Sequence, residues 1–211
     1  MKKYLKFSLP LLLTLCFSYF FILMFQITIQ YIPFRNDVAF LQIKQTEVSE
    51  IPFYITFFYI HVYSAIFVLL AGFTQFNSGL LKNQPAIHRS IGKLYVFTIL
   101  FFSAPSGLFI GVFANGGSYS KISFVILSTL WFYFTLKGFL TIKNKNIELH
   151  RAYMLRSFAL TFSAITLRFW KFFLVYLFQP YPMDVYQIIA WLGWVPNLLI
   201  IEFYLYHKSK K

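Results

Sequence analysis

The chain has 211 residues, of which 59% are hydrophobic, 23% aromatic and only 12% charged. A soluble domain is about one-half apolar and one-quarter charged, so this composition argues against a soluble protein. The net charge of +13 does not indicate nucleic-acid binding, because the basic residues lie mostly at the ends of apolar runs, as membrane topology requires. Cys16 is the only cysteine, which excludes an intrachain disulfide and a cysteine-based metal site.

Several apolar runs are long enough to cross the hydrocarbon core of a bilayer as helices. They predict an all-α, polytopic membrane bundle of six transmembrane helices within one integral membrane domain, residues 1–211. The predicted spans cover about residues 9–29, 53–76, 91–113, 119–142, 150–178 and 185–206. The first run is interpreted as a retained span, because its apolar core is longer than that of a signal peptide.

The segments between the spans carry the expected breaks. Residues 30–52 are mixed in character, and part of them, Asn36 to Lys44, is compatible with a short helix at the membrane interface. Pro105 predicts a kink in the third span, and Pro196 interrupts the sixth.

Charge placement predicts the orientation of the bundle. Six spans put both termini on the same side of the membrane. Thirteen basic residues of the tails and links fall on that side: Lys2, Lys3, Lys6, Lys82, Arg89, Lys93, Lys137, Lys143, Lys145, Arg151, Lys208, Lys210 and Lys211. Only Arg35, Lys44 and Lys121 are counted on the other side. Because positive charge collects in cytoplasmic loops, we expect both termini in the cytoplasm.

A short motif occurs twice. Gly72-Phe73 leads through a basic link to His88-Arg89 and the third span, and Gly138-Phe139 leads through another basic link to His150-Arg151 and the fifth. Spans two and three are therefore candidates for a helical hairpin duplicated as spans four and five.

His61 and Arg168 are polar residues deep inside predicted spans. At 1.5 Å per residue, the Cα of His61 lies about 22 Å from the cytoplasmic end of span two, and Arg168 lies about 27 Å beyond His150. Side chains on a helix lean towards its N-terminus, so in these antiparallel spans the two heads should approach a common level. Such residues mark either a polar pocket or a satisfied packing network, and both interpretations remain open.

Arg156 and Glu202 form a second candidate pair. Their Cα atoms lie about 9 and 6 Å from the inner edge of the membrane, and their side chains lean towards each other. We interpret them as a structural ion pair, while Arg156 also remains a candidate ligand-binding residue.

Two His-Arg pairs, His88-Arg89 and His150-Arg151, open helices at the cytoplasmic face. Cations at a helix start are mildly unfavourable unless an anion such as a phosphate, a carboxylate or a haem propionate binds there. The simpler interpretation is that they lie among anionic lipid headgroups, which are the expected partners of this face.

One face of span five carries a stripe of polar and small residues. It consists of His150, Ser157, Thr161, Ala164 and Arg168. Small and hydroxyl residues usually mark close packing between membrane helices, although the same stripe would also suit the wall of a cavity.

Three stretches together resemble a known family. They are GFTQF at 72–76, PAIHRSIGKLYVF at 85–97 and HRAYMLRSFALTFSAITLRFW at 150–170, taken with His61. They are similar to the bacterial multi-pass membrane proteins of domain of unknown function 2306, over roughly residues 55–175. The resemblance implies a helical bundle in the bacterial inner membrane, but it supplies no reaction, ligand or site.

The sequence therefore predicts a membrane protein that binds or moves a small acidic molecule or lipid. The candidate ligand-binding residues are His61, Arg168, His88, Arg89, His150, Arg151 and Arg156. One alternative is a transmembrane electron carrier in which His88 and His150 hold a b-type haem, and another is a structural membrane subunit. No catalytic motif and no metal-binding motif occurs in the sequence, so an enzyme is the least supported class.

Overall fold

A computed structural model describes the backbone of residues 2–76 and 78–210, and all of its regular elements are helical. Contacts divide the chain into two compact units, Met1–Gln45 and Thr46–Lys211. The all-α, polytopic class predicted from composition is confirmed. The prediction of a single integral domain stays a prediction.

The first unit contains the long helix α1 (Lys2–Ile29), which has an apolar part at Phe17–Ile29, and a 3₁₀ helix at Ala39–Ile43. The 3₁₀ helix falls inside the segment for which a short helix was expected. Beyond α1, the exposed Arg35 side chain donates two hydrogen bonds to Asp37, at 2.9 and 2.7 Å. The Arg35 guanidinium holds the pKa of the Asp37 carboxyl below its usual range, chiefly through this hydrogen bonding.

The second unit begins near the short helix α2 (Gln45–Glu50) and holds five helical stretches long and apolar enough to cross a membrane. These stretches, counted among the described residues, run over Tyr54–Gln75, Pro85–Val112, Gly117–Lys143, Ile147–Phe178 and Pro182–Ser209. The helices that form them are α3 (Tyr54–Gln75), α5 (Pro85–Thr98), α6 (Ala104–Val112), α7 (Gly117–Lys143), α8 (Ile147–Thr161), α9 (Ser163–Phe178), α10 (Pro182–Leu192) and α11 (Val195–Ser209). Short α4 (Ser78–Asn83) lies between α3 and α5.

Local chemistry explains where several helices begin. Pro85 and Pro182 lie in the first turns of α5 and α10, where a missing backbone N–H costs nothing. The Asn146 side chain caps α8 by accepting a hydrogen bond from the backbone N–H of Leu149 at 3.0 Å. Gly116 precedes α7 with φ of 84°, a left-handed conformation that glycine adopts without a steric penalty.

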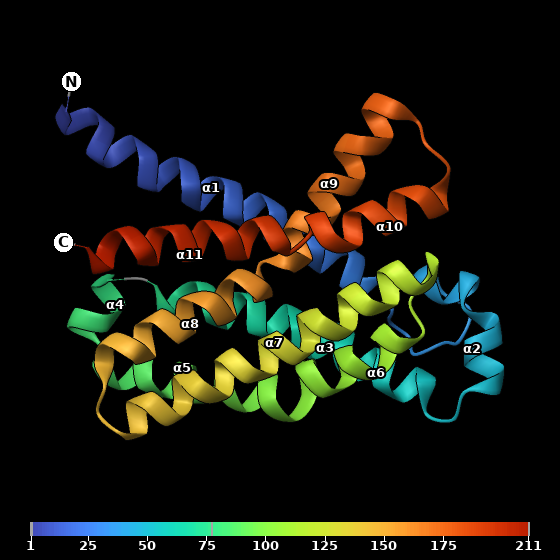
Figure 1. Ribbon diagram of the computed structural model, residues 1–211, viewed down its shortest axis with the longest axis horizontal. Helices are drawn as coiled ribbons and strands as arrows, with labels where there is room; N and C mark the ends of the chain where they lie inside the picture. The colour runs from blue at the N-terminus through green and yellow to red at the C-terminus, as the bar shows by residue number, and fades with distance from the viewer. Residues whose placement is uncertain (1, 77, 211) are drawn as a thin grey trace. The chain divides into compact units, whose positions relative to one another are not determined.

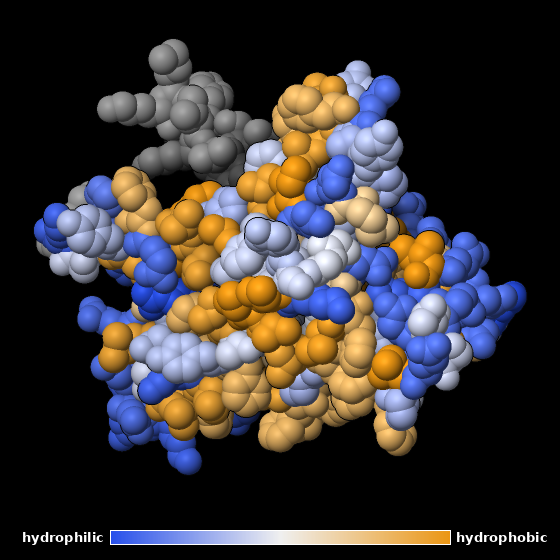
Figure 2. Space-filling view, turned by 45° about the vertical axis from the view of Figure 1, so that its right-hand side comes forward, coloured by the Kyte–Doolittle hydropathy of each residue, from blue (hydrophilic) through white to orange (hydrophobic). Residues whose placement is uncertain are grey.

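Four spans form a closed ring in which α3 contacts α5, α6 and α8, while α7 contacts α6 and α8 (Figure 1). The broken span α10–α11 packs on the outside of this ring, α10 against α7 and α9, and α11 against α8. Figure 2 shows apolar side chains along the flanks of the helices and hydrophilic ones gathered towards the helix ends. This is the surface that a bilayer requires of a membrane bundle.

The ring supports the predicted repeat of helical hairpins. If α3 corresponds to α7 and α5 to α8, each hairpin packs on the other through equivalent pairs, α6 with α7 and α8 with α3. Tyr95 lies seven residues after His88, and Ser157 lies seven after His150. Their hydroxyls are 3.0 Å apart, as expected of equivalent residues beside a two-fold axis. The two Gly-Phe motifs are out of register, however, because Gly72 faces Tyr95 whereas Gly138 faces Met154.

Three spans are interrupted. The third contains a π-helical turn at Ile99–Ser103, which ends two residues before Pro105, a residue that cannot donate a backbone hydrogen bond. The sixth breaks at Gly193–Trp194, just before Pro196 in the first turn of α11. The fifth, expected as one continuous helix over 150–178, instead bends at Phe162 between α8 and α9. No proline or glycine marks that bend in the sequence, so its cause lies in tertiary contacts.

Candidate functional site

His61 belongs to α3, and its side chain packs against the interrupted third span. Its ring Nδ1 lies 3.0 Å from the backbone oxygen of Ser103, the last residue of the π-helical turn. A carbonyl only accepts hydrogen bonds, so Nδ1 carries the proton and, in the neutral imidazole, Nε2 keeps its lone pair. The Ser103 hydroxyl donates to the Ser64 hydroxyl at 2.8 Å, which ties the same two segments together again.

A glycine makes room for this imidazole. A Cβ placed on Gly107 would lie 2.8 Å from His61 Cε1, 3.0 Å from Nδ1 and 3.2 Å from the Ser128 hydroxyl oxygen. These distances are shorter than ordinary packing contacts allow. The small residue is therefore what lets α3, α6 and α7 meet around the His61 ring.

Arg168 lies in the second turn of α9 and has an exposed side chain that leans back along its own helix. One guanidinium nitrogen donates to the backbone oxygen of Ala164 at 2.6 Å. The field of the Arg168 charge reaches His61 on α3 and Tyr186 on α10, while α9 itself packs chiefly on α10. The Tyr186 ring packs edge-on against Phe124 of α7, with the ring centres 6.1 Å apart. We call His61, Arg168 and Tyr186 the His61 cluster.

The bend at Phe162 sets the direction of α9 and therefore the position of Arg168. Hydrogen bonds connect this bend to the break between α10 and α11. The side-chain nitrogen of Asn197 lies 3.2 Å from the backbone oxygens of both Ala159 and Gly193, and 2.9 Å from the Thr166 hydroxyl. The Thr166 hydroxyl also donates to the Gly193 carbonyl. The two helix breaks are thus joined by one group of hydrogen bonds, to which α8, α9, α11 and the break between α10 and α11 contribute residues.

The polar stripe predicted on span five divides at this bend. Ser157 and Thr161, before the bend, belong to a buried hydrogen-bond network in the middle of the ring. Tyr95 lies within 3.0 and 2.8 Å of their hydroxyls, the Trp131 indole N–H donates to Thr161, and Ser157 is 2.7 Å from Thr135. Thr161 and Thr135 donate onward to backbone carbonyls, so this network is satisfied and serves packing.

His88 and His150 are each the fourth residue of a helix, α5 and α8, at the same end of the ring. We call this the basic end because it also carries Lys82, Arg89, Lys93, Lys143 and Arg151. His150 Nδ1 donates to the backbone oxygen of Gly138 at 2.8 Å. His88 Nδ1 is buried and has no hydrogen-bond partner among residues 2–76 and 78–210, and His150 acts on this ring electrostatically. Arg89 and Arg151 are exposed.

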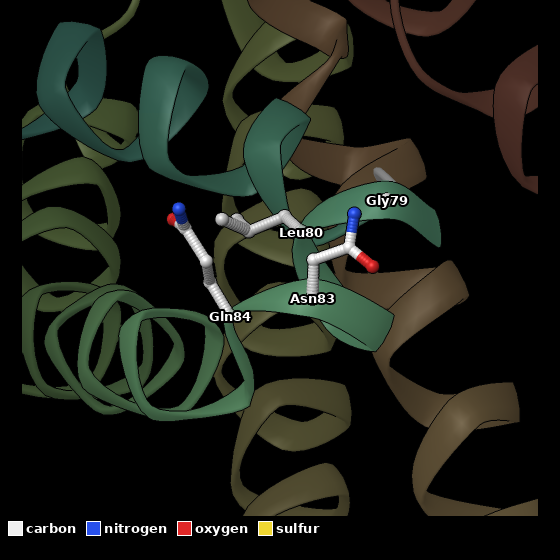
Figure 3. Close-up of a pocket in the computed structure, with 4 residues that line it drawn as sticks. All are labelled: Gly79, Leu80, Asn83 and Gln84. Atoms are coloured by element: carbon white, nitrogen blue, oxygen red, sulfur yellow. The ribbon is translucent and has the colours of Figure 1, made fainter.

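An open hollow of about 320 Å³ also lies at this end, next to the start of α5 (Figure 3). It is lined by Gly79, Leu80, Asn83 and Gln84 from α4 and the residue after it. None of the residues selected from the sequence lines it.

Arg156 and Glu202 join α8 to α11. Two guanidinium nitrogens donate to the two carboxylate oxygens, one of them over 2.8 Å. The Arg156 guanidinium also lies 5.5 Å from the centre of the Tyr153 ring and 5.8 Å from that of Phe134. The side chains are 21% and 44% exposed, so the pair is only partly shielded from its surroundings. Its structural role stays a prediction.

The structure joins Arg156 to Glu202, as helix geometry had suggested, and it adds residues that sequence reasoning missed. Tyr186 and Asn197 were overlooked because neither belongs to a motif or to a periodic polar stripe. Tyr95 could have been found, because it occupies the position in the first repeat that Ser157 occupies in the second.

Comparison with known proteins gives a family. The family model described as "Predicted membrane protein (DUF2306)" matches residues 58–205, well over half of the chain. No curated protein and no solved structure matches significantly.

Proposed function

Since the chain belongs to this family of predicted membrane proteins, whose description names no reaction, we propose a function from the geometry of the chain itself. The protein binds or moves a small acidic molecule or an acidic lipid at the His61 cluster. The observation that supports it is the placement of His61, whose ring is fixed on the third span by the Ser103 carbonyl and keeps Nε2 as an acceptor, with the charge of Arg168 acting on it from α9. Ionisable groups gathered in this way inside a membrane protein mark a ligand site more often than a random position does.

The chemistry of the three groups suits an acid. The guanidinium of Arg168 offers several N–H donors in a planar arrangement that matches a carboxylate or a phosphate. The Tyr186 hydroxyl is a further donor to an anion, and His61 Nε2 is an acceptor for the proton of an undissociated acid. Together they can hold an acidic group in either protonation state.

We also propose an orientation. The basic end would face the cytoplasm, with Arg89 and Arg151 among anionic lipid headgroups of the bacterial inner membrane, and both chain termini would lie on that side. The His61 cluster would then lie in the outer half of the bilayer. A reporter enzyme that is active only in the periplasm would be fused to the C-terminus, after Lys211. It should give no signal, and a strong signal would refute this orientation.

The ligand proposal is tested by identifying the molecules that co-purify with the protein. Wild-type protein and Arg168→Gln would be purified gently in lipid nanodiscs, and bound acidic molecules would be quantified per protein by mass spectrometry. Lys137→Gln is the matched control, because it removes the same charge from an exposed position on α7 about 20 Å along the helix from Phe124. We expect Arg168→Gln alone to lose a bound acid while its thermal unfolding midpoint stays unchanged.

Two results would count against binding. Equal acid content in all three proteins would show that Arg168 recruits no ligand. If Arg168→Gln unfolds early and Arg168→Leu combined with His61→Leu restores stability, the two residues serve packing, as in a structural subunit.

A second candidate, a b-type haem held by His88 and His150, is favoured by their proximity and by the buried, unpartnered Nδ1 of His88. The interior of the ring leaves little space for a haem between α5 and α8. Tyr95, seven residues or about 10 Å along α5, already spans the ring by hydrogen bonding to Ser157. We therefore expect no Soret band in protein purified after growth with ample haem, and a Soret band lost in His150→Ala would establish the haem instead.

A further inference from the structure

We propose that the place where the two helix breaks meet is a binding site for a monovalent alkali cation such as Na⁺. This junction consists of Ala159, Thr166, Gly193 and Asn197, which hydrogen bonds join across the fifth and sixth spans. It shares no residue with the His61 cluster, so the inference goes beyond the proposed function and does not depend on it. It follows from the number of oxygen atoms that meet at one point.

Three oxygen atoms surround the side-chain nitrogen of Asn197. Nδ2 lies 2.9 Å from the Thr166 hydroxyl oxygen and 3.2 Å from the backbone oxygens of both Ala159 and Gly193. An amide nitrogen carries only two hydrogens, so it cannot give each of these oxygens a well-formed hydrogen bond. The side-chain oxygen of Asn197 has no donor among residues 2–76 and 78–210. The junction is therefore rich in oxygen and poor in hydrogen, as the lining of a cation site is.

Two helices end at the junction. α8 ends at Thr161, two residues after Ala159, and α10 ends at Leu192, next to Gly193. The last carbonyls of a helix have no partner within it and carry the negative end of its dipole. The helices α9 and α11 start beside these ends and offset part of this field, but the atoms that face Asn197 Nδ2 are oxygens. A positive charge is favoured at that position.

The junction lies deep in both spans and is held in place by packing. Phe162 is about halfway along Ile147–Phe178, and Gly193 is near the middle of Pro182–Ser209. Broken membrane helices commonly supply backbone carbonyls to an ion at such a depth. α9 approaches Gly193 so closely that a Cβ there would lie 2.9 Å from the Cβ of Leu167. The Gly193 carbonyl is thus fixed before an ion arrives, which lowers the cost of binding one.

The type of oxygen selects the class of cation. The candidate ligands are two backbone carbonyls, one hydroxyl and one amide oxygen, all of them neutral. Ca²⁺ and Mg²⁺ sites rely on carboxylates, whereas carbonyl oxygens can replace the hydration shell of a monovalent cation. In the bound state the ion would take the position of Asn197 Nδ2. The amide would withdraw and turn its oxygen towards the ion, as the fourth ligand.

Direct binding tests the proposal. Full-length protein in phosphatidylcholine nanodiscs would be titrated with radioactive Na⁺, with choline chloride added to keep the ionic strength constant. We expect saturable binding, which Thr166→Val should weaken at least about tenfold because it replaces an oxygen ligand by a methyl group of the same size. Thr129→Val is the matched control, since the exposed Thr129 hydroxyl donates to the Val125 carbonyl of its own helix. It should leave the binding unchanged.

A carboxylate in place of the amide separates ion binding from hydrogen bonding. Asn197→Asp keeps the shape of the side chain but replaces the donor nitrogen by an oxygen. The thermal unfolding midpoint of this variant should therefore be low in choline chloride. In NaCl at about 100 times the dissociation constant it should rise by about 5–11 °C. The wild-type midpoint should rise less, because the Asn197 amide competes with the ion for the same oxygens.

Two results would overturn the inference. One is an Asn197→Asp midpoint that is equally low in NaCl, KCl and choline chloride, which would show that Asn197 is only a hydrogen-bond donor. The other is Na⁺ binding that is absent, or that is the same in wild type and Thr166→Val. Stronger displacement of radioactive Na⁺ by KCl than by NaCl would support the site and identify K⁺ as its preferred ion.

Discussion

Replacing Gly107 by alanine should displace the His61 imidazole from its position beside α6. The new methyl group would lie 2.8 Å from His61 Cε1 and 3.2 Å from the Ser128 hydroxyl, so the ring must rotate or α6 must shift away from α3. Overpacking of this kind costs about 1–3 kcal/mol. Losing the 3.0 Å hydrogen bond from His61 to Ser103 costs about 1 kcal/mol more, and the better helix propensity of alanine returns about 1 kcal/mol.

The net expectation for Gly107→Ala is a loss of about 1–3 kcal/mol in the free energy of unfolding, or about 2–12 °C in the thermal midpoint. The same substitution in a His61→Ala background meets no imidazole. There only the Ser128 hydroxyl, 3.2 Å away, remains close to the new methyl group, so the destabilisation should be clearly smaller than in the wild-type background. The assay is thermal unfolding of all four proteins of this cycle in the same nanodiscs. An equal destabilisation by Gly107→Ala in both backgrounds would show that His61 does not occupy the space beside Gly107.

Three further substitutions test the contacts around the site. Tyr95→Phe removes the hydroxyl at the centre of the buried network and should lower the free energy of unfolding by about 1–3 kcal/mol, whereas Tyr119→Phe at an exposed position should leave the thermal midpoint unchanged. Asn197→Leu removes the donor that joins the two helix breaks, so backbone hydrogen exchange in α9 should accelerate relative to α3; unchanged exchange would mean that other contacts hold the bend. Arg156→Gln and Glu202→Gln should each destabilise by about 1 kcal/mol, and the double variant should be little worse than either one, whereas additive losses would show that the two side chains act independently.

Local sequence patterns were sufficient for the irregularities that have a local cause. Pro105 and Pro196 cannot donate a backbone hydrogen bond, so interruptions beside them follow from the residues alone. The bend at Phe162 has no such marker. It is stabilised by Asn197, 35 residues further along the chain, and by the close approach of α9 to Gly193, and neither contact has a periodic signature.

The candidate site shows the same division. The levels of His61 and Arg168 along their helices were estimated from helical rise and from the lean of side chains, and a pocket shared by the two residues stays a prediction. Tyr186 was not foreseen, because its place depends on the packing of α10 against α7 and α9. The identity of neighbouring helices depends on tertiary packing, which spacing along one helix does not encode.

The amino-acid sequence by itself determined that this chain is a helical membrane protein and which of its ionisable residues lie within the apolar spans, because apolar length and charge placement are read one helix at a time. Only the tertiary structure decided that α8 closes the ring while α9 leaves it, and so where the charge of Arg168 lies. The physical reason is that a bend without proline or glycine is stable only when side chains of another helix satisfy the backbone groups it frees. Those side chains become visible only once the helices are packed.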